Sequence, residues 1–62
     1  REQTAVKEIQ IIAENAGAKI ISLSFEKDEY ARLVVSGCDE TEMGSIEEKI
    51  KTATGYMAEV TK

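Results

Sequence analysis

The chain has 62 residues, with 12 acidic against 8 basic side chains, no His, no Pro, no Trp and a single Cys. This length permits one compact domain at most, and a domain of about 60 residues buries only about 60% of the surface of its unfolded chain, so a partner would stabilise it. The single Cys excludes an internal disulfide framework and fits a reducing, cytoplasmic compartment. The net charge of −4 argues against nucleic-acid binding, and no apolar run is long enough to span a membrane.

A helix is predicted over residues 4–16, where apolar side chains recur at helical spacing. The apolar face consists of Ala5, Ile9, Ile12, Ala13 and Ala16. Thr4 fits the N-cap position, because its hydroxyl can accept a hydrogen bond from an early backbone amide. Gly17 fits the stop, because glycine readily takes the left-handed conformation that ends many helices.

The apolar period changes to two over residues 18–26, which predicts a half-buried strand. One face carries Ile21, Leu23 and Phe25, and the other carries Ile20, Ser22 and Ser24. The charged stretch 27–29 contains no Gly, so we expect a turn longer than a two-residue type I′ turn. Residues 30–36 alternate again, which predicts an antiparallel hairpin with Ala31, Leu33 and Val35 on one face.

Two starts compete for the second helix, because two capping boxes lie close together. Asp39 with Glu42 makes one, and Ser45 with Glu48 makes the other. We expect the helix to begin at residue 40 or 41, with an apolar stripe formed by Met43, Ile46, Ile50 and Ala53.

The second helix is expected to end at Gly55, and residues 56–61 return to the alternation of a short strand. Glu47 and Lys51 are spaced for an ion pair along the helix. The predicted core consists of Ile9, Ile12, Ala13, Ala16, Ile21, Leu23, Phe25, Leu33, Val35, Ile46, Ile50 and Ala53.

The element order α-β-β-α-β predicts an α+β fold formed by residues 1–62 as a single domain. It matches a ferredoxin-like two-layer sandwich, β-α-β-β-α-β, with the first β-strand absent from this chain. Two explanations stay open: the sequence is a fragment of a longer protein, or a partner chain supplies the strand.

The chain resembles an ACT domain, a small regulatory module, over nearly its whole length; another ferredoxin-like module is the rival interpretation. The resemblance is carried by TAVKEIQIIAENAGAKIISLSFEKDEYARLVVSG, by the acidic helix that follows and by GYMAEV. It implies a non-catalytic, allosteric sensor without a cofactor. Such a module dimerises through its sheet, binds a small effector, usually an amino acid, at the dimer interface, and controls an attached domain.

The resemblance also implies where an effector would bind. The loop before the first helix, which carries a Pro-Gly pair in the family, corresponds here to Gln3, Thr4 and Ala5. The turn that reads Gly-Ala-Asn-Ile in the family reads Gly17-Ala18-Lys19-Ile20 here, so the ligand-binding Asn is replaced by Lys19. Both motifs therefore differ from those of the family. Lys19 could attract an anionic ligand, although a solvated Lys at the start of a strand is the more common arrangement.

The second face of the predicted sheet is a candidate interface between copies. It is expected to carry Ile20, Ser22, Val34 and Tyr56. Apolar side chains gathered on a sheet face are typical of an interface, with ordinary scattered exposure as the alternative. An open sheet edge also invites strand pairing, so we expect a homodimer or higher oligomer. A purely structural dimerisation module without a ligand is the alternative function.

The remaining reactive side chains point to no catalytic or metal site. Cys38 lacks the base or electropositive setting that activates a thiol, since the chain has no His and three acids follow within four residues. Asp39, Glu40 and Glu42 lack the ligand spacing and Gly of an EF-hand loop, and helix capping explains Asp39 and Glu42. We therefore expect neither an enzyme nor a metal protein.

Overall fold

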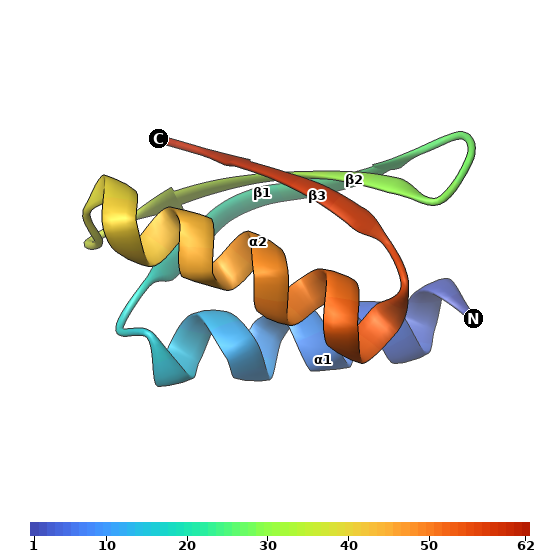
Figure 1. The fold of residues 1–62 in the computed structure, drawn as a ribbon, viewed down its shortest axis with the longest axis horizontal. Coiled ribbons are helices and arrows are strands. Elements are labelled where there is room, and N and C mark those ends of the chain that lie inside the picture. Colours follow the sequence, from blue (N-terminus) through green and yellow to red (C-terminus); the bar gives the residue numbers. More distant parts are fainter.

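The computed structural model describes all 62 residues and shows an α+β fold in which two helices cover one face of a three-stranded sheet (Figure 1). The elements are α1 (Glu2–Asn15), β1 (Lys19–Glu26), β2 (Tyr30–Ser36), α2 (Glu40–Thr54) and β3 (Met57–Thr61). The predicted order α-β-β-α-β is confirmed. Neither helix has the length and apolar character that crossing a membrane requires.

The sheet has the strand order β1-β2-β3 and mixes two kinds of pairing. β1 and β2 form the predicted antiparallel hairpin. β3 lies parallel to β2 on the other side, reached through α2. β1 and β3 are therefore the two edge strands, and β2 is paired on both sides.

The turn between β1 and β2 contains three residues, as the absence of Gly predicted. Asp28 and Glu29 adopt positive φ angles of 63° and 57°, a region that costs a residue with a side chain about 1–2 kcal/mol. Neighbouring segments hold the turn in this conformation. The Met57 amide donates to the Glu29 carbonyl at 2.9 Å, and Arg1 forms an ion pair with Glu29 at 2.6 Å.

The core lies between the helices and the inner face of the sheet. It contains no buried polar residue, and no buried side-chain nitrogen or oxygen lacks a hydrogen-bond partner. Its buried residues are Ala5, Ile9, Ala13, Ala18, Ala31, Leu33, Val35, Cys38, Ile46, Ile50, Tyr56 and Val60. Half-buried Ile12, Ala16, Ile20, Leu23, Phe25, Met43 and Ala58 pack against it.

The prediction that Ile21 belongs to the core is wrong, because a β-bulge interrupts β1. Ile20 lies opposite Val35 and Ser22 lies opposite Val34, so Ile21 is the extra residue between two paired positions. The bulge turns Ile20 toward the core and leaves Ile21 59% exposed. A strict period of two does not predict this extra residue.

Two predictions about the helices are also wrong. α1 begins at Glu2 with Arg1 at the N-cap position, so Thr4 lies inside the helix and does not cap it. Ala53 is exposed, because it lies at the margin of the stripe centred on Ile46 and Ile50 and borders the hollow between α1 and α2.

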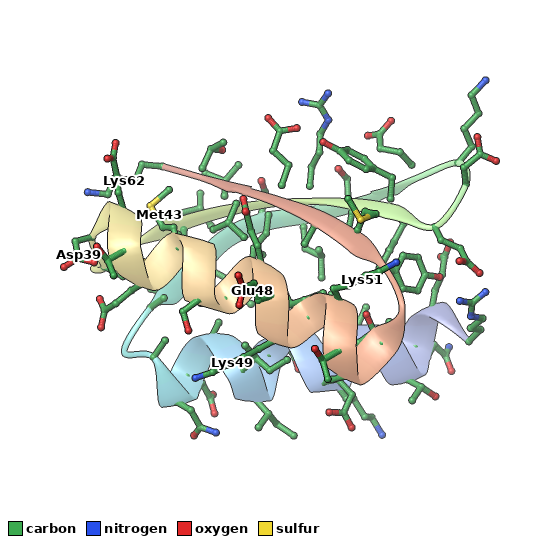
Figure 2. All side chains as sticks on the ribbon, viewed as in Figure 1. Asp39, Met43, Glu48, Lys49, Lys51 and Lys62 are labelled. Carbon is green, nitrogen blue, oxygen red and sulfur yellow. The ribbon has the colours of Figure 1, made fainter.

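The helix ends follow the capping chemistry of the sequence. Asp39 caps α2 and forms a capping box with Glu42, so this start prevails over the one at Ser45. Asp39 lies at one end of α2 and Lys51 near the other (Figure 2). Gly55 ends the helix at a φ of 82°, as expected.

The predicted Glu47–Lys51 ion pair does not form. Lys51 donates to the carbonyl of Gly55 at 3.3 Å. The Glu47 carboxylate instead accepts from the backbone amide of Val60 at 2.9 Å. Glu47 therefore links α2 to the edge strand β3.

Replacing Asp39 by Ala should lower the free energy of unfolding by about 1 kcal/mol, because the first turn of α2 loses its side-chain acceptor. Urea denaturation followed by circular dichroism measures this loss. Ser45→Ala is the matched control and should be neutral or slightly stabilising, because Ser45 is exposed inside the helix. Equal losses in the two variants would contradict the assigned start of α2.

Candidate functional site

The turn from α1 into β1 forms one wall of a surface hollow of ≈ 470 Å³. One side of the hollow consists of α1 side chains, and the other consists of the turn and the start of β1. The lining residues are Gln10, Ala13, Glu14, Ala18, Lys19 and Ile20. Three of them, Ala18, Lys19 and Ile20, belong to the effector stretch that the sequence predicts.

Local sequence explains the shape of this turn. Gly17 takes a φ of 76°, which brings its amide to the Glu14 carbonyl at 3.0 Å and the Ala18 amide to the Ala13 carbonyl at 2.9 Å. This pair of hydrogen bonds is a Schellman motif, which satisfies the last carbonyls of the helix and reverses the chain. Lys19 then leaves the turn beside the last turn of α1.

The hollow brings together two opposite charges that have no partner. The ion pairs of the structure join Arg1 to Glu29, and Arg32 to Glu26 and Glu59; Glu14 and Lys19 take part in none. Both side chains are exposed. The hollow therefore offers one cationic and one anionic group, with the amide of Gln10 able to donate and to accept.

The other predicted effector stretch lies at the opposite end of α1. Gln3 and Thr4 are exposed in the first turn of the helix, while Ala5 is buried in the core. At a rise of 1.5 Å per residue, about 16 Å of helix separates Thr4 from Asn15, the last residue of α1 before the turn. One chain therefore does not bring its two predicted effector stretches together.

The structure divides the predicted interface residues between the two sheet faces. Ser22 and Val34 lie opposite each other on the uncovered face, as expected. The prediction that Ile20 and Tyr56 share this face is wrong. The bulge turns Ile20 inward, and Tyr56 is 5% exposed, with its ring centroid 5.0 Å from that of Phe25.

The uncovered face carries a polar network across its centre. Tyr30 donates to a carboxylate oxygen of Glu59 at 2.5 Å, and Arg32 lies 3.8 Å from Glu59 and 3.9 Å from Glu26. The hydrogen bond to Glu59 is the main cause that raises the pKa of Tyr30 above its usual value. Exposed Ile21 and Met57 lie outside this network.

Sequence reasoning missed two kinds of residue. Gln10 and Glu14 line the hollow, and their spacing of four was a usable signal, since it places them on one side of the helix together with Gln3. Met57 is exposed on the uncovered face, and its alternation with the neighbouring core residues could have identified it. Nothing in the local sequence indicated that Ile21 is bulged.

The structure holds no group of three acidic, Cys or His side chains arranged to bind a metal ion. Asp39 and Glu42 are engaged in the capping box of α2. Cys38 is buried. The hollow at the α1–β1 turn contains three residues of the predicted effector stretch, and it is therefore the candidate site.

No protein-family model matches this chain, and neither a curated protein nor a solved structure is significantly similar to it.

The raised pKa of Tyr30 predicts a loss of stability in the alkaline range. Because the pKa is higher in the folded than in the unfolded chain, the contribution is complete below the ordinary value of 10.0 and is lost as pH rises through the folded pKa. Tyr30→Phe should remove this part of the pH dependence. Urea denaturation of both proteins from pH 8 to pH 11 measures it, and identical slopes above pH 10 would contradict the assignment.

Proposed function

We propose that this chain is a regulatory, non-catalytic module that binds an amino acid or a similar small effector between two copies of itself and so controls an attached domain. The observation that carries the proposal is the hollow at the α1–β1 turn, which is lined by Glu14 and Lys19, two opposite charges that take part in no ion pair. The resemblance to ACT domains supports the same interpretation.

The chemistry of the hollow is complementary to a zwitterion. Lys19 can bind an α-carboxylate, Glu14 can bind an α-ammonium group, and Gln10 can hydrogen-bond to either. Exposed charges contribute little in water, where such pairs give about 0–1 kcal/mol. A second copy that covered the hollow would exclude water and strengthen both interactions.

The open edge of β1 supports pairing with a second copy on the side of this hollow. The edge of β3 is less open, because Glu47 already accepts from the outward amide of Val60. β1 has no neighbour on its outer side. Unpaired backbone groups on such an edge are available to another strand.

Pairing of two β1 strands about a two-fold axis would also unite the two predicted effector stretches. α1 and β1 run in opposite directions, joined by the tight turn at Gly17 (Figure 1). The two-fold axis reverses the partner, so the first turn of its α1 approaches the α1–β1 turn of this chain. Gln3 and Thr4 of one copy would then complete the hollow of the other, across the distance that no single chain spans.

We also propose that the fold is ferredoxin-like with its first strand absent. The α+β order and the two helices on one sheet face are compatible with it. In a ferredoxin-like fold another strand splits the βαβ unit, whereas β2 and β3 pair directly here. A first strand from a preceding segment or a partner would therefore insert between β2 and β3.

A purely structural dimerisation module is the second candidate function. The uncovered sheet face, with exposed Ile21 and Met57, supports it. So does the replacement of the family's ligand motifs by Gln3-Thr4-Ala5 and Lys19. A dimer that responds to no ligand would select this function.

Thermal melting against the common amino acids and several nucleotides tests the effector proposal. A ligand at 100 times its Kd adds about 2.7 kcal/mol of stability. For a domain of this size the melting temperature should rise on the order of 10 °C or more. A flat panel would contradict the effector proposal.

Variants of the hollow test where such a ligand binds. Lys19→Met and Glu14→Gln should each abolish most of the shift, because each removes one of the two charges that the zwitterion needs. Lys49→Met and Glu48→Gln are matched controls and should retain it, because these exposed residues of α2 line a separate hollow between α1 and α2 (Figure 2). If the control variants lose the rise in melting temperature, or the hollow variants retain it, the ligand binds elsewhere.

A further inference from the structure

Two consecutive isoleucines at the bulge of β1 occupy opposite environments. Ile20 packs against the core, while Ile21 is 59% exposed. The strand beyond them is regular, with Leu23 opposite Leu33 and Phe25 opposite Ala31. Counting back from Leu23 in steps of two gives Ile21, not Ile20, as the next residue on the core face.

We propose that β1 has two registers that exchange at this bulge. In the first, which the structure shows, Ile20 is inside and Ile21 is the bulged residue. In the second, the bulge is absent and Ile21 takes the place opposite Val35. Both registers place one isoleucine on the core face, so burial of apolar surface distinguishes them only weakly.

The exchange requires a short movement. Residues from Ser22 onward keep their partners in both registers. A slip of the whole strand would move every side chain to the other face of the sheet, but this slip is confined to residues 19–21. Ile20 moves to the position opposite Ser36, and Lys19 moves to the position opposite Gly37, each by about 3.3 Å. Lys19 lies at the beginning of the strand, where its long side chain reaches water in either register.

The segment that must absorb the movement contains two glycines that lie near each other. Gly17 and Gly37 have φ angles of 76° and 87°. A Cβ atom added to Gly37 would lie 3.4 Å from the carbonyl oxygen of Gly17. Glycine at both of these positions gives the backbone the freedom to move there.

The two registers present different hollows. Ala18, Lys19 and Ile20 line the hollow in the first register, and Lys19 and Ile20 shift in the second. A ligand that fits only one hollow would select its register and fix the start of the β1 edge. This consequence rests on the proposed function, whereas the exchange itself does not.

Serine substitutions at both isoleucines, alone and combined, test the exchange. In Ile20→Ser, Ile21 should replace the lost side chain, so this variant should lose much less stability than the control Leu23→Ser, which has no spare neighbour. Ile21→Ser should be nearly neutral. Each single substitution raises the equilibrium constant for unfolding by a certain factor. In the double variant this factor should be at least about tenfold larger than the product of the two single factors. Urea denaturation measures all four.

Methyl NMR of Ile20→Ser gives a direct second readout. The proposal predicts contacts between the Ile21 and Val35 methyl groups that the unsubstituted chain shows only weakly. Exposed Ile21 methyl groups, or an Ile20→Ser variant that is unfolded or as unstable as the double variant, would overturn the exchange. None of these measurements uses a ligand, so a flat ligand panel and a failed exchange are separate outcomes.

Discussion

Both helices cover the same face of the sheet, and the rest of this molecule follows from that arrangement. The buried residues all gather between the helices and the inner sheet face, with Ile9, Leu33, Ile46 and Ile50 almost fully enclosed. The outer face and the outer edge of β1 are left without a protein neighbour (Figure 1). The covered face of the sheet thus forms the core that stabilises the chain, and the outer face is exposed as a second surface.

Alanines make this thin core feasible. Ala5, Ala13, Ala18 and Ala31 are buried and occupy little space, so α1 lies close to the sheet and to α2. Because α1 lies close to the sheet, the chain passes from α1 into β1 through a tight turn, which Gly17 permits. The candidate hollow is the surface of that turn, so the geometry of the site depends on the packing of the core.

The sequence predicted those features that local chemistry decides. The capping box at Asp39 and the stop at Gly55 appear in the sequence as short-range patterns, and both are confirmed. The hairpin follows from the alternation of its two strands. These elements were predictable because each depends on residues within a few positions of one another.

Features that depend on distant partners were not predictable in the same way. The bulge places Ile20 rather than Ile21 on the core face, a choice made by pairing with Val35 and Val34. Tyr56 lies directly before β3, which runs parallel to β2 with Val60 opposite Leu33. Its ring centroid lies 5.0 Å from that of Phe25 in β1. For the candidate site, the turn at Lys19 followed from the sequence, and the spacing of Gln10 and Glu14 places both on one side of α1. That this side faces the hollow is decided by packing between distant segments.

Sedimentation equilibrium measures whether a second copy completes the site. The mass should rise with concentration from the 6.8 kDa of one chain to twice that value, and an effector should strengthen the dimer. Lys19→Met should still dimerise but should not respond to the effector. A mass of one chain at every concentration, with or without an effector, would show that two copies do not form the site.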